Sequence, residues 1–298
     1  MTLMCPARIL LLPGDVLEPA IGERIAQVYA GAFEAAAGSR LADQLGVRLT
    51  VVPELVDRPD EELQAIADLH RGETVVVLGL DLGLRLPALV EHTGDGWTRV
   101  PSDNEVTLAA YEQAAEKFRD SLPRGPSEVT DRWYDRIGEA VAPGASVLEI
   151  GSGTGEDAVA LEERGCRVRR TDAARSFVEM IRADGFAADQ LNAITDDLGG
   201  PYDLIFADAV FLHFNRTELT TVLRKAHGAA AHLAFTTREG DGGEWSNRFL
   251  DLPRRFNSWQ EQPLRDLLTE TGWTITHLDR GQTRFGNSWF HILAKRDQ

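Results

Sequence analysis

Three glycines at alternate positions, with a carboxylate just before them, form the segment whose residue types and spacing could do chemistry. Gly151, Gly153 and Gly155 follow an apolar run, residues 147–150, that contains Glu149. A helical pattern begins directly after the glycines, so the segment is typical of a buried strand that runs through a tight turn into a helix. Because glycine permits sharp turns and the close approach of a ligand, this turn is predicted to bind one.

A second carboxylate, Asp172, lies 21 residues after Gly151 and follows a second predicted strand, residues 167–171. An acid at the tip of this strand is placed to bind both hydroxyls of a ribose, so the unit indicates an adenosyl ligand. Dinucleotide sites prefer the spacing G-x-G-x-x-G and aim a helix end at an anionic pyrophosphate. Here the spacing is E-x-G-x-G-x-G, and Glu149 beside the turn suits a cationic ligand instead.

On these residues, the segment resembles motif I of the class I S-adenosylmethionine-dependent methyltransferases, and the resemblance extends over roughly residues 111–295. It implies the α/β fold of that family, a Rossmann-like seven-stranded methyltransferase core, here preceded by a smaller N-terminal α/β domain. It also implies S-adenosyl-L-methionine as cofactor and S-adenosyl-L-homocysteine as product. The alternative is a Rossmann-like unit that binds another nucleotide or no ligand.

The resemblance also assigns cofactor-binding residues, because motif I of the family lies around the methionine moiety and the ribose. Tyr111 matches a tyrosine that covers the cofactor in many members that act on small molecules; the alternative is a surface aromatic residue on an amphipathic helix. Residues 185–191 resemble the third strand and the adenine loop, in which Asp189 could accept from the exocyclic amine. The predicted cofactor-binding residues are Tyr111, Glu149, Gly151, Ser152, Gly153, Asp172, Ala173, Asp189, Gln190, Leu191 and Ala207.

Two candidate catalytic residues follow the fourth predicted strand, residues 202–208, whose C-terminal end faces the ligand crevice in sheets of this kind. His213 is the candidate base, because the reference pKa of histidine, about 6.5, suits neutral pH; alternatively, it orders the crevice wall. Asp208 either binds the acceptor or caps a helix. The sequence shows no cluster with metal-ligand spacing, so no metal is predicted.

The predicted acceptor-binding residues lie in the segment 238–258, which is long for a connection in an α/β fold. Glu239, Asp241 and Glu244 would suit ammonium groups, and Trp245 a sugar face; the alternative is a solvated loop. The formal charge of −16 argues against a nucleic-acid acceptor. The prediction is therefore N-methylation of a cationic small molecule.

The predicted acceptor is an amine of an amino sugar or aminoglycoside-type antibiotic intermediate. Arginine outnumbers lysine 28 to 3, which suits a GC-rich genome, where such tailoring enzymes are common. Two alternatives stay open: O-methylation of a hydroxyl or carboxyl of a natural product, and a non-catalytic domain that binds S-adenosylmethionine.

The length of 298 residues suggests two domains. Residues 1–104 are predicted to form an accessory α/β domain, for dimerisation or for covering the acceptor site, and residues 105–298 the methyltransferase domain. Cys5 and Cys166 form no disulfide framework, and no signal peptide or membrane-spanning run is visible. The protein is therefore expected in the cytoplasm, with no membrane partner and with homodimerisation through the N-terminal domain as one option.

The elements that position these residues are predicted from hydrophobic periodicity and from helix breakers. In residues 1–104, strands are expected at 8–12, 47–52 and 74–80, and helices at 19–37 and 60–69. Beyond them, helices are expected at 102–121, 128–141, 215–227 and 260–270, and strands at 147–150, 167–171, 185–191, 202–208, 231–237, 273–278 and 288–294.

Overall fold

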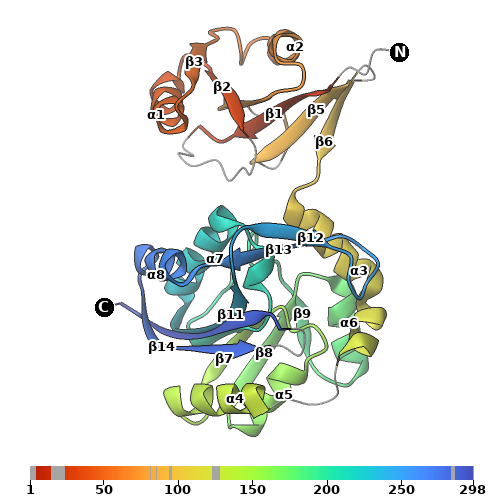
Figure 1. The fold of residues 1–298 in the computed structure, drawn as a ribbon, viewed down its shortest axis with the longest axis vertical. Helices are drawn as coiled ribbons and strands as arrows, with labels where there is room; N and C mark the ends of the chain where they lie inside the picture. Colours follow the sequence, from red (N-terminus) through yellow and green to blue (C-terminus); the bar gives the residue numbers. More distant parts are fainter. Residues whose placement is uncertain are drawn as a thin grey trace. The chain divides into compact units, whose positions relative to one another are not determined.

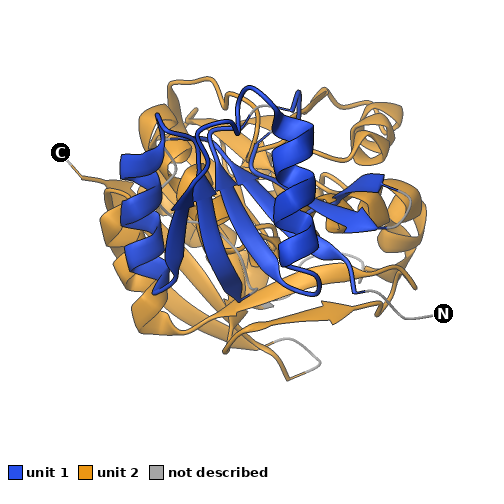
Figure 2. Cartoon of the chain, turned by 90° about the horizontal axis from the view of Figure 1, so that it is seen from above, with its two compact units in different colours: residues 1–102 blue, residues 103–298 orange. Residues whose placement is uncertain are grey.

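The computed structural model describes residues 5–14, 24–80, 82–84, 86–93, 96–122, 128–282 and 286–297. The chain divides into two compact units, Met1–Ser102 and Asp103–Gln298, which Figure 2 shows in different colours. Each unit has its own sheet and its own hydrophobic core. Among the described helices, none is both long enough and apolar enough to cross a membrane.

The first unit is a six-stranded sheet in the order β3-β2-β4-β1-β5-β6. The central strand, β4, is buried along its whole length, because α1 packs on one face of the sheet and α2 on the other. The elements are β1 Ala7–Leu12, β2 Ile25–Ala30, α1 Ala35–Leu45, β3 Arg48–Val51, α2 Pro59–Leu69, β4 Thr74–Leu78, β5 Ala88–Thr93 and β6 Gly96–Val100.

The prediction of a helix over residues 19–37 is wrong. Ile25–Ala30 forms strand β2, and helix α1 begins at Ala35; residues 19–23 lie outside the described part of the chain. Ile25, Val28 and Tyr29 have the spacing of a helical stripe, but a short apolar run fits a strand buried on both faces equally well. Here β2 pairs with β3 on one side and β4 on the other, and its residues pack into the cores on both faces of the sheet, Tyr29 on one and Val28 on the other.

The second unit is a nine-stranded sheet whose main path runs β12-β13-β11-β10-β7-β8-β9, with β15 paired to β11 and β14 paired to β15. Figure 1 shows helices on both faces of this sheet. The elements are α3 Asp103–Ser121, α4 Glu128–Ala140, β7 Ser146–Ile150, α5 Glu156–Glu163, β8 Arg167–Asp172, α6 Arg175–Ala183, β9 Ala188–Gln190, β10 Tyr202–Ala207, the 3₁₀ turn η1 Phe211–His213, α7 Arg216–Ala229, β11 Ala230–Glu239, β12 Gly243–Ser246, β13 Arg254–Trp259, α8 Glu261–Glu270, β14 Trp273–Gln282 and β15 Ser288–Arg296.

The Rossmann-like α/β class is confirmed, but the sheet holds two strands more than the seven predicted. The additional strands, β12 and β13, form an antiparallel hairpin inside the segment expected to be a loop. This hairpin joins the sheet through two register pairs, Arg238 with Ser258 and Glu239 with Trp259. The last two strands, β14 and β15, pair antiparallel with each other, and β15 also runs antiparallel to β11.

The two faces of the second sheet are covered by different helices. One core packs Leu219 of α7 and Leu264 of α8 against Phe235 of β11, and the opposite core packs Ile137 of α4 and Leu161 of α5. Strands β7, β8, β10 and β11 are mutually parallel, so their C-terminal ends share one edge. Helix α3 contacts both α6, which follows β8, and β13, which follows β11.

Candidate functional site

The glycine turn, the second acid and the end of β10 lie together because the strand register aligns them. Glu149 pairs with Arg170 on β8 and with Phe206 on β10. The residues that follow these positions therefore leave the sheet at one level, which is where ligands bind in open parallel sheets. Gly151, Asp172 and Asp208 all leave the sheet at this edge.

The turn after β7 can be built only with glycine at Gly151. Its φ of 71° is left-handed, a conformation that costs other residues roughly 1–2 kcal/mol. A Cβ atom there would also lie 2.4 Å from Cγ2 of Val210, which is well inside contact distance. Helix α5 then starts with Glu156 and Asp157 in its first turn. Two acids at that position would repel a pyrophosphate, so the site fits a cationic ligand better.

Glu149 is buried beside the turn with one oxygen unused. Ser152 donates its hydroxyl proton to Oε2 of Glu149 and accepts a hydrogen bond from the amide of Thr171 at 3.0 Å. No described residue hydrogen-bonds Oε1. Burial raises the pKa of Glu149 to about 7, against the lowering effects of Ser152 and Arg170. A buried acceptor oxygen of this kind suits the ammonium group of a methionine moiety.

Two more carboxylates, both partly buried, lie near Glu149 and increase the demand for a cation. Asp208 accepts a hydrogen bond from the Thr236 hydroxyl at 2.6 Å, and burial raises its pKa. Asp157 accepts from the hydroxyl of Tyr134. Its pKa is raised by burial and then by the charges of Asp208 and Glu149. The sequence analysis missed Asp157, although an acid directly after the glycine turn is a visible signal.

Asp172 ties the glycine turn to the end of β8. Its Oδ2 accepts from the amide of Gly153 at 3.0 Å and its Oδ1 from the amide of Ala174 at 2.8 Å. Burial raises the pKa of Asp172 to about 6, although these backbone hydrogen bonds oppose the rise. Each carboxylate oxygen retains acceptor capacity, so the group also fits ribose hydroxyls.

The structure separates the residues predicted at the adenine. The carboxylate of Asp189 binds Arg169 at 2.8 Å and is half exposed, while the side-chain amide of Gln190 donates to the carbonyl of Ala173 at 3.1 Å. Leu191 is buried in the core, as is Ala207 at the end of β10. The backbone of Leu191 remains at the ligand edge, because its amide donates to the carbonyl of Asp172.

Tyr111 on α3 forms a hydrogen-bonded chain with His213 and the hairpin. The Tyr111 hydroxyl lies 2.9 Å from Nε2 of His213, and Nδ1 of His213 lies 2.6 Å from the carbonyl oxygen of Arg255. A carbonyl only accepts, so Nδ1 carries the ring proton and Nε2 accepts from Tyr111. Burial, followed by the charges of Arg254 and Arg238, lowers the pKa of His213 to about 4. The ring is therefore neutral, and its free lone pair is already engaged.

The predicted acceptor-binding acids do not form one open cluster. Glu239 binds Arg280 through both oxygens, at 2.9 and 3.0 Å, and Glu244 binds Arg238 at 2.8 Å. Asp241 is exposed, as is Trp245, with 44% of its surface accessible. The acids belong to an ordered hairpin, and arginines already neutralise two of the three.

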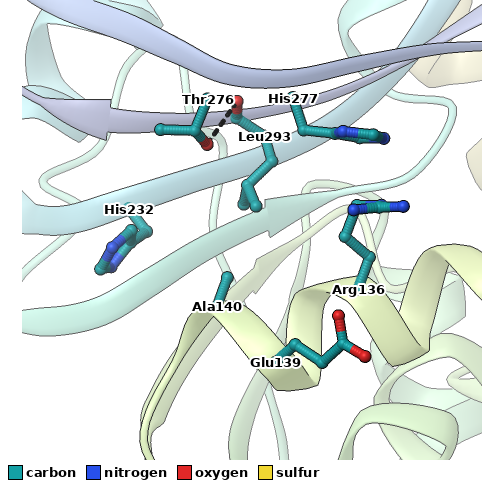
Figure 3. A pocket seen from close by; sticks show the side chains of 7 residues that line it. All are labelled: Arg136, Glu139, Ala140, His232, Thr276, His277 and Leu293. Carbon is teal, nitrogen blue, oxygen red and sulfur yellow. Dashed lines mark hydrogen bonds between the residues drawn. The ribbon is translucent and has the colours of Figure 1, made fainter.

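A shallow groove of about 330 Å³ lies elsewhere in the second unit, between α4 and strands β11, β14 and β15. Figure 3 shows Arg136 of α4, His232 of β11 and His277 of β14 around it. His232 precedes Glu239 on β11 by seven residues, which at about 3.3 Å per residue is roughly 23 Å from the ligand edge. The groove is therefore not part of the site at the strand ends.

Comparison with known proteins agrees with this geometry. A family model described as a methyltransferase domain matches residues 119–278, more than half of the chain. No curated protein matches the chain. Among solved structures, the magnesium protoporphyrin IX methyltransferase of Synechocystis PCC 6803, with bound S-adenosylmethionine, is similar over 66% of this chain and 99% of its own, with 16% identity and a TM-score of 0.53.

Two further structures are similar at the level of the fold. The 1,6-didemethyltoxoflavin-N1-methyltransferase of Burkholderia thailandensis covers 72% of this chain and 98% of its own, with 16% identity and a TM-score of 0.55. The CcbJ methyltransferase of Streptomyces caelestis is similar over 63% of this chain and 98% of its own, with 15% identity and a TM-score of 0.52. Fold and site together define a Rossmann-like methyltransferase that uses S-adenosylmethionine. The chain belongs to the methyltransferase-domain family.

Proposed function

We propose that the enzyme methylates an amine of its small-molecule acceptor and that Asp208 receives this amine. The observation that supports the proposal is the place of Asp208, at the end of β10 with a raised pKa and a hydrogen bond from Thr236. Bound S-adenosylmethionine supplies an activated methyl group, which passes in line to the nucleophile while the sulfur leaves as a neutral thioether. Asp208 pairs with the ammonium form and takes the proton that frees the nitrogen lone pair.

The state of His213 favours nitrogen over oxygen as the methylated atom. A hydroxyl acceptor needs a base that removes its proton, and His213 is the residue predicted for that role. Its Nε2 is hydrogen-bonded to Tyr111, and its pKa is lowered to about 4, which makes it a poor base at neutral pH. We propose that His213 instead positions Tyr111 over the cofactor.

A cationic amino sugar or aminoglycoside-type antibiotic intermediate is the second candidate for the acceptor. Its remaining support is the exposed pair of Asp241 and Trp245, because arginines hold Glu239 and Glu244. We also propose that the enzyme works in the cytoplasm, since both cysteines, Cys5 and Cys166, are free. The N-terminal unit is proposed to pair subunits or to cover the acceptor site.

The test is an assay of S-adenosylhomocysteine release with matched pairs of amines and alcohols. Amines should be the active members of the pairs. Asp208→Asn should lower kcat about 100-fold or more, in the range expected for loss of an acid–base group, while affinity for S-adenosylhomocysteine changes less than about threefold. His213→Asn is the comparison variant and should affect kcat less. Activity on alcohols alone would overturn the amine proposal. If neither amines nor alcohols cause release of S-adenosylhomocysteine, a non-catalytic binding domain would be favoured.

A further inference from the structure

Arg254, on strand β13, is a buried cation that forms no ion pair with any acid in the described part of the chain. Its side chain is 3% exposed. One terminal nitrogen, Nη1, donates to the Tyr111 hydroxyl at 3.1 Å, and Nη2 donates to the carbonyl oxygen of Arg248. Nε is buried without a hydrogen-bond partner among the described residues. Three of the five N–H groups that a guanidinium carries are thus left for another acceptor.

The neighbouring arginines show that this lack of an acid is particular to Arg254. Arg238 binds Glu244 at 2.8 Å, and Arg255 lies 3.4 Å from Asp103. Within the described part of the chain, no carboxylate lies within 4.0 Å of Arg254. A buried charge is costly unless it is paired. The faces of Tyr111 and Phe256, 5.3 and 5.2 Å from Cζ of Arg254, offset only part of that cost.

In the sheet order, Arg254 lies on the other side of β10 from the glycine turn and the predicted ribose acid, where room for an acceptor is expected. The glycine turn follows β7 and the ribose acid ends β8, whereas the hairpin with Arg254 continues from β11. Strands β11 and β10 lie between β13 and β7 in the sheet order, so the hairpin strand is displaced by about three strand spacings, roughly 14 Å. Tyr111 links the two sides: its ring lies 6.1 Å from that of Phe177 on α6, and its hydroxyl binds Arg254.

We propose that Arg254 binds an anionic group of the acceptor, most suitably a carboxylate, which a guanidinium can hold through two parallel hydrogen bonds. This inference rests on the proposed function, and together with an amine held at Asp208 it makes the acceptor amino-acid-like rather than polycationic. Because Arg254 is buried, the anion reaches it only when α3 and the hairpin separate, so the site closes over its ligand.

Benzoate and benzamide, which have the same shape but differ in charge, are suitable probes. Ligand-detected NMR is used to titrate both into the full chain saturated with S-adenosylhomocysteine, and into the full chain alone. Benzoate should bind at least about tenfold more tightly than benzamide, as expected for a charge-assisted pair. Arg254→Met should abolish this preference and Arg254→Lys retain part of it. Arg238→Met, the matched control, removes a nearby charge that Glu244 already balances and should keep the preference. Equal binding of both probes to the natural protein overturns the proposal.

A second measurement separates the acceptor from the other source of a carboxylate, the methionine moiety of the cofactor. Calorimetry with S-adenosylhomocysteine should give affinities within about threefold for the natural protein and Arg254→Met. If that affinity falls tenfold or more while the benzoate preference persists, Arg254 holds the cofactor and the proposal is wrong. A purely structural arginine would lower the melting temperature when replaced, whereas loss of an unbalanced buried charge should leave it equal or raise it. The paired amine and alcohol assay tests the amine proposal separately, so failure of that proposal can be distinguished from failure of the inference about Arg254.

Discussion

At the scale of the residue, the site depends on the absence of a Cβ atom at Gly151. A Cβ atom at this position would lie 2.4 Å from Val210, and its φ of 71° is already unfavourable for other residues. Gly165 has a similar φ, 86°, but open space around it. The pair therefore separates the cost of backbone conformation from the cost of close approach.

Gly151→Ala should lower the free energy of unfolding by about 2–5 kcal/mol, the sum of left-handed strain and overpacking, and should weaken binding of S-adenosylhomocysteine. Gly165→Ala should lose only about 1–2 kcal/mol and bind normally. Chemical denaturation and calorimetry check both variants. Equal losses of stability in the two variants would show that the close approach to Val210 adds no cost to the substitution at Gly151.

The ribose assignment makes a second pair of residues informative. Asp172→Ala should weaken binding of S-adenosylhomocysteine by on the order of 1–3 kcal/mol, because ribose hydroxyls and two backbone amides lose their acceptor. Asp189→Ala should change affinity less than about threefold, since its carboxylate binds Arg169 and surface ion pairs contribute little. Calorimetry measures the affinity of both variants for S-adenosylhomocysteine. A larger loss at Asp189 would restore the adenine contact predicted from the sequence.

The raised pKa of Glu149 predicts how stability and binding respond to pH. In the folded protein this pKa is about 7, against an ordinary value of 4.5, so between these values the unfolded state binds fewer protons. The free energy of unfolding should therefore fall as pH rises from about 4.5 to about 7. Glu149→Gln should remove the contribution of Glu149 to this pH dependence of the free energy of unfolding. Chemical denaturation at several pH values in the same range measures it.

Binding of S-adenosylmethionine should shift the protonation equilibrium of Glu149. A cation beside Glu149 favours the ionised form, so binding near pH 7 should release protons, and affinity should increase with pH through this range. Calorimetry in buffers with different ionisation enthalpies measures the release. If Glu149→Gln releases as many protons as the natural protein, another group is responsible, and Asp157 is the next candidate.

The features of the site that the sequence reveals and those that it does not differ in what determines them. The special backbone of Gly151 and the strand-end position of Asp172 follow from local sequence order, so a motif reveals them. The absence of an acid beside Arg254 among the described residues and the Glu239–Arg280 ion pair depend on contacts between segments far apart in the chain. Sequence spacing carries no information on such contacts, and the acidic segment was consequently interpreted as free to bind cations.

At the scale of the element, α3 and the β12–β13 hairpin close the ligand edge, with the Tyr111 hydroxyl between them and a hydrogen bond from the Arg255 amide to the Thr107 hydroxyl beside it. Tyr111 donates to His213 and accepts from Arg254. The sequence predicted α3 within one residue but treated the hairpin as a loop. Its glycines suggested hinges, whereas its pairing is set by residues facing one another across β12 and β13.

Tyr111→Phe should loosen this closure, because Nε2 of His213 and Nη1 of Arg254 both lose a partner. Release of S-adenosylhomocysteine should become at least about fivefold faster, with faster hydrogen exchange in the second half of α3. The control is Tyr202→Phe, whose hydroxyl contacts Arg169 and the carbonyl of Leu198 instead. Stopped-flow dissociation checks both variants, and equal release rates in the natural protein and Tyr111→Phe would show that α3 does not retain the product.

At the scale of the whole molecule, the two units have separate sheets and separate cores. The glycine turn, Asp172, Asp208 and the hydrogen-bond partners named for them all belong to Asp103–Gln298. A fragment of residues 101–298 should therefore fold and bind S-adenosylhomocysteine within about threefold of the full chain. Circular dichroism and calorimetry test this. A folded fragment without binding would mean that residues 1–100 complete the cofactor site.

The attachment of the hairpin has a consequence for the evolution of this enzyme. Two register pairs connect β13 to β11, while the glycine turn and Asp172 belong to strands on the other side of β10. Under the proposed function, insertions, deletions or recombination within residues 240–258 would alter which molecule is methylated while the glycine turn and Asp172 stay unchanged. Lineages can diversify their chemistry by exchanging one small module, and laboratory libraries confined to that module should retain donor binding in most members.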